Sequence, residues 1–510
     1  MKINGRRKDE KEAFPFWNDF IIVMHGGVQK TRGERKTPQE VSVTPQPEKV
    51  DFSNIEKHVV WYHDAMLTNT VDERIFTRFN QLLLERGYDF VVDFVTEPSI
   101  TELEYRKYQK KLRDYKEQGK QVDLIFTGWS MVEGAATYDS GVQDGLLEPL
   151  DDYFASEKGH VLYEAFPENI WEMMQRDGKV YGISGNGWYG PYYSASLNAD
   201  LLKKYKVEAP EEFSFEAYLA AVGKVYEKAA EEGEELLPLY LTADAVYSAL
   251  GYYKLGDFWL RQNQDRTVEF VNPYEDEEAR RIFVLLEKYR KKFGGFGTSE
   301  QYRVLQKSGR LIGSFHVTQM KFSFQNQCVD YPAVTYEPQK EFYSLPMHNV
   351  AFGVASWATY PEEAKQLLTL ILTDEEFVNL LYYGVKGVNY SLENGHAITS
   401  DARGLRAPGF ESQVNEKLAY PVSAEPLNKK EVLQKQQEEV VFLSAKLEQF
   451  PDAQLSEEER KVAEIFREAE GLWLGEQENA VQKAEQYCEA LKALHVEDIL
   501  QRLTQLGKEE

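Results

Sequence analysis

The stretch VDLIFTG, residues 122–128, has the composition of a short strand that is apolar enough to be buried on both faces. Two similar runs precede it, HVVWYH (58–63) and DFVVDFV (89–95). Amphipathic segments with helical spacing separate the three runs, and each segment opens with a capping box and closes with a glycine. This β-α-β-α-β order predicts a parallel sheet covered by helices, with any ligand bound beyond the carboxyl ends of the strands.

The composition excludes several classes of protein. A chain of 510 residues with 42% hydrophobic residues is too long for one ordinary core, so two or more lobes are expected. The formal charge of −25 argues against a nucleic acid or an anionic membrane surface as partner. Two cysteines, Cys328 and Cys488, make neither a disulfide framework nor a Cys-rich zinc site, and their state stays open. The sequence contains no run of about eighteen apolar residues, so no membrane-spanning helix is expected.

The N-terminal segment gives little sign of structure. Residues 1–24 are basic and then partly apolar, but Asn18 and Asp19 interrupt the apolar run. No clear signal peptide and no lipid-anchor cysteine are recognised there. Residues 28–50 are polar and contain prolines, so residues 1–54 are expected to form a disordered segment and tether.

Motifs of enzymatic chemistry are missing from the sequence. Gly185, Gly187 and Gly190 match a dinucleotide-binding pattern, but Pro191 follows at once where a helix should open. No HExxH, GxxxxGK, CxxC or GxSxG pattern occurs, and the histidines are scattered. We therefore expect no enzyme, no cofactor and no metal site. The possibility of two carboxylates paired for glycoside hydrolysis stays open, because among 84 acidic residues some pairs come together by chance.

Four phrases in order carry a resemblance to a known family. They are DGLLEPLDDYF (144–154), FPENIWEMMQRDGKVYGIS (166–184), YYSASLNADLLKKYKVEAPEEFSFEAYL (192–219) and FGVASWATYPEEAKQLLTLILTDEEFVNLLYYGVKGVNYSLENG (352–395). Through these four phrases, roughly residues 55–500 resemble the extracellular solute-binding proteins of bacterial ABC importers. The resemblance is to the sugar-binding (family 1), lipoprotein-like branch.

The resemblance implies a two-lobed α/β fold of the periplasmic-binding-protein (Venus-flytrap) kind, with a ligand cleft and several hinge crossings. Residues 55–184 and 313–354 are expected to form lobe 1. Residues 186–310 and 358–510 are expected to form lobe 2, with 430–510 helical. Glycines at a crossing absorb the change of backbone angles on closure. The hinge residues expected at the crossings are Ser184, Gly185, Gly187, Gly190, Gly313 and Gly353.

Ligand-binding residues are expected after strand ends and beside the crossings. Aromatic rings cover the C–H faces of a saccharide, and polar groups bind its hydroxyls. Trp129 is the strongest candidate, because it directly follows the third strand. Trp259 with Asp257 offers a ring beside an acceptor, although burial in the core of lobe 2 explains it equally well. The full set is Trp129, Ser130, Asn186, Trp188, Tyr189, Tyr192, Asp257, Trp259, His316, Asn349 and Trp357.

The function that the resemblance implies is capture of a carbohydrate, expected to be an oligosaccharide, and its delivery to the transmembrane subunits of an ABC permease. The protein is expected to be a monomer and, by the same resemblance, extracellular and associated with the cell surface. Two alternatives remain from the residues: a ligand sensor with the same fold that presents its helical C-terminal region to a partner, and a carbohydrate-active hydrolase. A peptide ligand also stays open, since an aromatic-lined cleft suits several amphipathic molecules.

Overall fold

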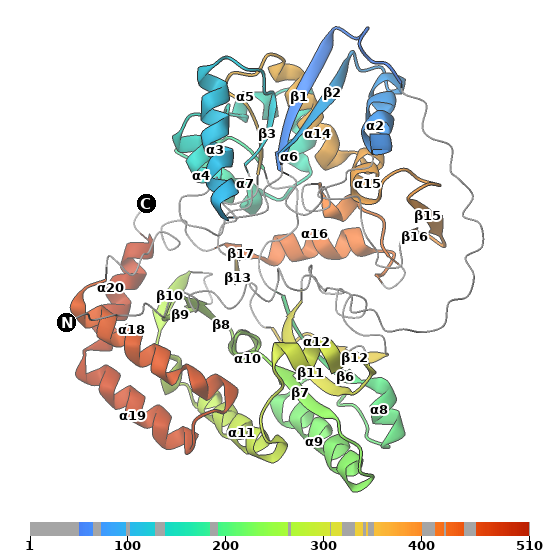
Figure 1. Ribbon diagram of the computed structural model, residues 1–510. Helices are drawn as coiled ribbons and strands as arrows, with labels where there is room; N and C mark the ends of the chain where they lie inside the picture. The colour runs from blue at the N-terminus through green and yellow to red at the C-terminus, as the bar shows by residue number, and fades with distance from the viewer. Residues whose placement is uncertain are drawn as a thin grey trace, which may run out of the picture.

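The protein has two lobes of mixed α/β structure (Figure 1). The computed structural model describes residues 50–64, 73–97, 102–127, 138–183, 192–263, 267–305, 308–318, 332–339, 343–344, 351–399, 414–422, 425–442 and 455–508. Each lobe is built around its own four-stranded sheet and its own apolar core. The predicted two-lobed α/β architecture is confirmed. The predicted disordered segment, residues 1–54, lies outside the described residues except for 50–54.

The first lobe contains the sheet that the sequence predicted. Its strand order is β14-β3-β1-β2, with β1 parallel to both β2 and β3. A fourth strand, β14, joins the edge antiparallel to β3. The strands are β1 (Lys57–Asp64), β2 (Phe90–Glu97), β3 (Leu124–Phe126) and β14 (Phe352–Val354). The helices before β14 are α2 (Glu73–Glu85), α3 (Glu102–Glu117), α4 (Tyr138–Gln143), α5 (Asp151–Phe154), α6 (Glu157–Glu164) and α7 (Glu168–Met174), followed by the hairpin β4 (Gln175–Arg176) and β5 (Lys179–Val180).

Helix α2 illustrates how the sequence fixes a helix on this sheet. Its apolar residues recur at helical spacing, and Ile75, Phe79 and Leu83 are buried against the sheet. The side-chain amide of Asn80 donates to the Val92 carbonyl at 3.0 Å and accepts from the Val92 N–H at 2.8 Å. Because β2 is the edge strand of the sheet, this pair satisfies backbone groups that have no neighbouring strand.

The second lobe has a sheet of different topology, with strand order β12-β6-β11-β7. Strand β11 is parallel to β7 and antiparallel to β6, and β12 is antiparallel to β6. The strands are β6 (Tyr192–Asn198), β7 (Leu237–Leu241), β11 (Leu311–Thr318) and β12 (Ala333–Tyr336). A second, antiparallel sheet contains β8 (Tyr252–Leu255), β9 (Phe258–Gln262) and β10 (Val268–Val271). The helices are α8 (Ala199–Lys204), α9 (Phe215–Glu231), α10 (Ala243–Ala249), η1 (Pro273–Glu275), α11 (Glu277–Phe293) and α12 (Ser299–Leu305).

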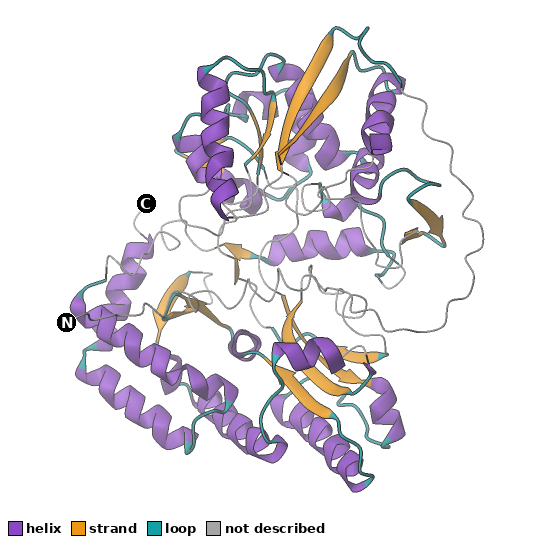
Figure 2. Cartoon of the chain, viewed as in Figure 1, coloured by secondary structure: helices purple, strands orange, loops and turns teal. Residues whose placement is uncertain are grey.

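The C-terminal helices complete the core of the second lobe (Figure 2). They are α18 (Glu457–Ala469), η5 (Glu470–Leu474), α19 (Ala480–Ala493) and α20 (Val496–Lys508). Helix α18 begins with a capping box, in which Ser456 and Glu459 bind each other's backbone N–H. Trp473 is fully buried, with its ring 5.2 Å from Trp259 and 4.8 Å from Phe283. The described part of residues 430–510 is mainly helical, as predicted, but it also contains the short strand β17 (Val441–Phe442).

Residues 361–399, 414–422 and 425–440 belong to the first lobe, which corrects the predicted domain boundaries. They contain α14 (Pro361–Thr373), α15 (Glu375–Tyr383), β15 (Tyr390–Glu393), β16 (His396–Thr399), η3 (Glu416–Leu418) and α16 (Lys429–Glu439). The segment was assigned to the second lobe with the rest of 358–510, but the apolar faces of α14 and α15 are buried in the first core. Residues 313–318 were assigned to the first lobe, yet β11 is hydrogen-bonded between β6 and β7.

Helix α16 lies on the side of the first lobe that faces the second lobe (Figure 1). A buried ionic cluster fixes its start: the Lys429 ammonium lies 3.1 Å from Glu425 and 3.7 Å from Glu416. The Tyr382 hydroxyl donates to Glu416 at 3.0 Å. At the other end of the helix, the Asn169 amide donates to the Gln437 carbonyl at 3.0 Å. Next to α16, β13 (Tyr343–Ser344) pairs in parallel with β17 (Val441–Phe442).

Candidate functional site

The candidate site is one edge of the second-lobe sheet, made by residues 192–194, 241–244, 316–318 and 336–339, and named the facing edge below. Strands β7 and β11 are parallel and both end at this edge, where the antiparallel β6 begins. Ligands of α/β proteins bind beyond such carboxyl ends. The edge lies toward the first lobe, because the Tyr192 side chain is part of the first lobe's apolar core although its backbone starts a second-lobe strand.

Polar side chains cover one face of the sheet at this edge. Ser194, Ser196, Ser314 and His316 alternate on the two central strands and are all buried. The hydroxyls of Ser196 and Ser314 are hydrogen-bonded at 3.0 Å. Hydroxyl groups both donate and accept, so these side chains can bind one another across the two strands.

Three rings form a cluster beside these hydroxyls. Tyr240 and Tyr302 stack with centroids 4.4 Å apart and planes 19° apart. The His316 ring lies 4.8 Å from Tyr302 and 5.3 Å from Tyr240. The Tyr240 hydroxyl and the Ser299 hydroxyl, on α12, are hydrogen-bonded at 3.1 Å. The cluster brings rigid aromatic surface and a titratable imidazole to the end of β11.

A carboxylate lies in the first turn of α10, just beyond the end of β7 on the same edge. Burial raises the pKa of the Asp244 carboxyl, and hydrogen bonds, including one from the Tyr193 hydroxyl, oppose that rise. The residue as a whole is half-buried. Burial is the main cause of the raised pKa of the Tyr193 and Tyr247 hydroxyls, and the negative charge of Asp244 is the second cause. The Asp244 carboxylate therefore lies at the facing edge, close to the phenol groups of Tyr193 and Tyr247.

Tyr192 connects the two lobes at this edge. Burial, followed by the charge of Glu337, raises the pKa of its hydroxyl, which is hydrogen-bonded to that carboxylate. Glu439, at the end of α16 on the first lobe, adds to the same shift. Close by, the Tyr193 backbone N–H donates to the Gln339 side chain at 3.0 Å. Groups of both lobes therefore meet around one phenol.

The corresponding edge of the first lobe is described only in part. His63 is fully buried near the end of β1, with its ring 6.0 Å from Phe126. Thr127 directly follows β3, and it binds Ala351 through both its backbone N–H and its hydroxyl, at 2.8 and 3.0 Å. The predicted ligand residues Trp129 and Ser130 come next after Gly128 but lie outside the described residues.

Several other predicted residues also lie outside the described part of the chain: the ligand candidates Asn186, Trp188, Tyr189 and Asn349, and the hinge candidates Ser184, Gly185, Gly187 and Gly190. Tyr192 and His316 lie together at the facing edge, where sequence analysis placed candidates for ligand contact. Their role in binding stays a prediction.

Asp257, Trp259 and Trp357 lie away from the facing edge, which corrects their assignment. Asp257 forms an ion pair with Arg467 on α18. The Trp259 ring is fully buried between Tyr247 and Trp473, so core packing accounts for it. Trp357 follows β14, which runs antiparallel to β3 and so ends at the opposite edge of the first sheet. Its indole N–H donates to the Lys120 carbonyl at 2.9 Å.

Gly313 and Gly353 are sheet residues rather than hinges. Gly313 lies within β11, and a Cβ added there would approach the Tyr218 hydroxyl to 2.8 Å. Gly353 lies within β14, and a Cβ would come 2.6 Å from the Tyr181 carbonyl oxygen. Both positions require glycine because backbone or side chains pack against them closely.

Sequence analysis missed Tyr193, Asp244, Tyr240, Tyr302 and Glu337. The signal that singled out Trp129, a chemically suited residue just after a buried strand, also fits Asp244 after LPLYL (237–241). Tyr193 and Glu337 could be found only from the pairing of β6 with β11 and β12, which joins segments more than a hundred residues apart.

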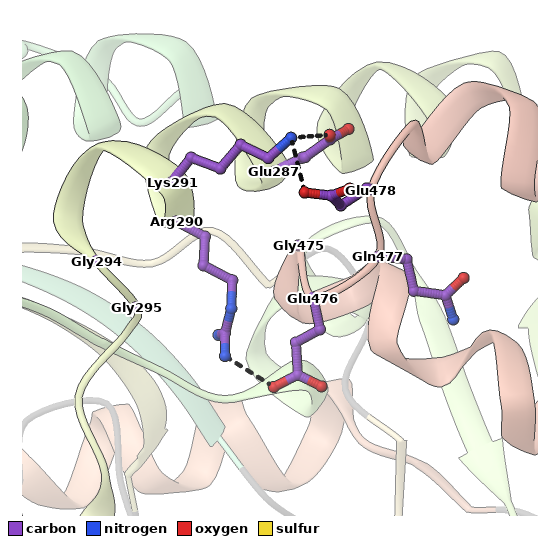
Figure 3. Close-up of a pocket in the computed structure, with 9 residues that line it drawn as sticks. All are labelled: Glu287, Arg290, Lys291, Gly294, Gly295, Gly475, Glu476, Gln477 and Glu478. Atoms are coloured by element: carbon purple, nitrogen blue, oxygen red, sulfur yellow. Dashed lines mark hydrogen bonds and ion pairs between the residues drawn. The ribbon is translucent and has the colours of Figure 1, made fainter.

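A separate recess of about 270 Å³ lies between the end of α11 and the start of α19 (Figure 3). Its charged side chains are paired with one another: Lys291 lies 2.9 Å from Glu287, and Arg290 lies 3.1 Å from Glu476. Because these groups neutralise each other, they offer little to a charged ligand. Within the described ranges, no cluster of three or more His, Cys, Asp or Glu side chains could hold a metal ion. None of the described helices is long and apolar enough to cross a membrane.

Comparison with known proteins supports the fold assignment. No protein-family model and no curated protein matches the chain. Among solved structures, it is similar to the N-glycan transport solute-binding protein NgtS from Streptococcus pneumoniae, with TM-score 0.63 and 16% identity over 89% of this chain and 98% of that one. It is also similar to an HMO-binding ABC-transporter-associated solute-binding protein from Bifidobacterium longum infantis, with TM-score 0.53 and 12% identity over 88% and 98%. The expected solute-binding-protein fold is thus confirmed.

Proposed function

We propose that this protein is the substrate-binding component of an ABC import system, which captures an oligosaccharide between its lobes and delivers it to a permease. The observation that carries the proposal is the facing edge. Hydroxyls, stacked rings and a carboxylate meet there at the carboxyl ends of β7 and β11. Saccharides need rings for their C–H faces and polar groups for their hydroxyls.

The similar solved structures support the choice of ligand class. The S. pneumoniae protein has also been solved in complex with Man1GlcNAc, in a structure with TM-score 0.53 and 15% identity to this chain. The B. longum infantis protein is described as HMO-binding. Both are solute-binding proteins rather than enzymes, which agrees with the absence of a catalytic motif in this sequence.

Capture requires contacts from both lobes. A ligand shifts an open ensemble toward a closed one only through its higher affinity for the closed state. Nearly complete switching needs a difference of about 10⁴-fold, or about 5.5 kcal/mol. The facing edge would supply the second-lobe contacts, and Trp129 after β3 would supply a ring from the first lobe.

Calorimetric titration and small-angle X-ray scattering on the purified chain test the proposal, with a panel of neutral oligosaccharides and with NADH and a short peptide as controls. We expect one sugar class to bind and to reduce the radius of gyration. Ligand at a hundred times its Kd should add about 2.7 kcal/mol of stability. Binding of NADH or peptide alone would contradict the proposal.

A matched pair of variants tests where the sugar binds. Trp129→Ala is expected to weaken binding at least tenfold. Trp357→Ala removes the same ring at the opposite edge of the first sheet and should bind like wild type. Equal affinity of both variants would remove Trp129 from the site.

A further inference from the structure

The last turns of α16 contain two glutamines at positions where a core-facing helix normally has apolar residues. The buried face of the helix consists of Lys429, Leu433, Gln436 and Gln437. Gln437 is only 2% exposed and Gln436 only 8%. Among the described residues, the Gln436 Oε1 and both polar atoms of the Gln437 amide have no hydrogen-bond partner. A buried polar group without a partner costs free energy, so these amides call for an explanation.

The other buried side-chain amides of the described chain are all satisfied. In each one the NH₂ group donates a hydrogen bond and the oxygen accepts at least one. They belong to Asn80, Asn198, Asn379 and Asn415. Asn169, beside Gln437, is half satisfied: its Nδ2 donates to the Gln437 carbonyl at 3.0 Å, but its Oδ1 has no partner among the described residues. The unpaired amide groups are therefore concentrated at one end of α16.

This end of α16 lies where the chain leaves the first lobe. Helix α16 is on the side of that lobe that faces the second lobe, and β17 follows it directly (Figure 1). The charge of Glu439, next to these glutamines, acts on the Tyr192 hydroxyl. Since Tyr192 begins β6 at the facing edge, the amides belong to the first-lobe side of the same region between the lobes.

The chemistry of a primary amide restricts its partners. Its oxygen accepts hydrogen bonds and its NH₂ group donates two, whereas a hydroxyl both donates and accepts. One amide can therefore bind two neighbouring hydroxyls at once, donating to one and accepting from the other. Pairs of neighbouring hydroxyls are the common feature of neutral sugars.

We propose that Gln436 and Gln437, with Asn169 beside them, form a first-lobe subsite that binds neighbouring hydroxyl groups of the captured sugar. This inference rests on the proposed function, because it assigns the first-lobe contacts of the same ligand. Because both glutamines are covered in this arrangement of the lobes, the sugar has to reach them in a more open one.

Gln437→Leu and Gln436→Leu test the subsite, because leucine fills a similar space without an amide. In the ligand-free protein the melting temperature should stay the same or rise, since an unpaired buried amide is removed. Affinity for the tightest-binding neutral oligosaccharide of the panel, measured by calorimetric titration, should fall at least tenfold. Gln434→Leu makes the same change on the exposed face of α16 and should keep the affinity within twofold.

The possible outcomes separate this inference from the proposed function. Unchanged affinity of both buried variants would overturn the subsite and leave sugar capture intact. Loss of ligand-free stability in both variants would show that the amides serve the fold, for example through a buried water, and would also overturn it. Absence of sugar binding by the wild type would contradict the proposed function and the subsite together.

Monodeoxy analogues of the same oligosaccharide locate the contact. At least one analogue should bind the wild type at least tenfold more weakly than the parent sugar does. The same analogue and the parent sugar should bind Gln437→Leu within threefold of each other, because the hydroxyl has already lost its partner. If every analogue weakens binding equally in both proteins, Gln437 does not contact the sugar.

Discussion

The main sheets of the two lobes both have four strands, but they differ in how far apart in the sequence their paired strands lie. The parallel strands of the first lobe come from consecutive residues, 57–126, and its antiparallel strand β14 joins at the edge. In the second lobe the antiparallel strand β6 lies inside the sheet, between β12 and β11, which come more than a hundred residues later. The parallel part of the first sheet is therefore assembled locally, whereas the order of the second sheet depends throughout on long-range pairing. The described polar site lies on the second sheet.

The apolar cores of the two lobes are largely separate from each other. Apart from Tyr192, which packs into the first core, each lobe has one large cluster of described buried apolar residues, and the second lobe has a further small one of Tyr240, Tyr302 and Leu311. Mutations in one core should therefore act on that lobe, provided that the lobes unfold as separate cooperative units. Four predictions test this separation.

The largest effect is expected for Trp259→Ala. The substitution removes a fully buried ring that packs on Tyr247 and Trp473, and we expect a loss of about 3–5 kcal/mol. Differential scanning calorimetry should show a lower transition for the second lobe and an unchanged one for the first. A joint fall of both transitions would show that the lobes unfold together. Full stability with lost sugar binding would restore Trp259 as a ligand residue.

A large effect on the first lobe is expected for Lys429→Met. The change leaves Glu425 and Glu416 buried without their cation, which should cost about 3 kcal/mol. Urea unfolding measures the loss. Lys435→Met is the matched control on the same helix, because its pair with Glu439 is exposed, and it should change stability by less than about 1 kcal/mol. Similar losses for both variants would contradict the importance of burial.

The third prediction concerns pH and Lys417, whose ammonium donates to the Ala165 carbonyl at 2.9 Å. Burial lowers its pKa from 10.5 to about 8. Between these values the unfolded chain binds more protons than the folded one, so this residue makes stability rise with pH. The gain from pH 7 to 10.5 is expected to reach up to about 3 kcal/mol. It is measured as the difference between wild type and Lys417→Met, which should have the flatter profile; parallel profiles would show that Lys417 is not desolvated.

The smallest effect is expected at the start of α18. Ser456→Ala removes the side-chain half of the capping box with Glu459 and should cost the second lobe about 1 kcal/mol. Ser456→Thr keeps the hydroxyl and should retain most of the stability. Calorimetry of both variants decides whether a single cap in the C-terminal helices affects the whole second-lobe core.

Predictability from sequence follows the same division. The first-lobe strands and α2 were predictable because their periodicity and caps lie within the local chain. The position of β11 was not, since pairing with β6 depends on a register that no local pattern encodes. Likewise, Trp259 is enclosed by Trp473, more than two hundred residues later, so its sequence neighbours could not reveal its burial. At the site, Tyr192 and His316 were named from their place beside presumed crossings, whereas Asp244 was missed because its strand was not recognised.

Because residues 455–503 supply part of the second-lobe core, that lobe cannot finish folding until Leu503 has been synthesised. The first lobe already has its described core residues once Val440 has emerged from the ribosome. During the interval, the apolar faces of β9 and α11 lack their cover and are open to chaperones and proteases. Residues 455–503 thus complete the second-lobe core after the first lobe already has its described core residues.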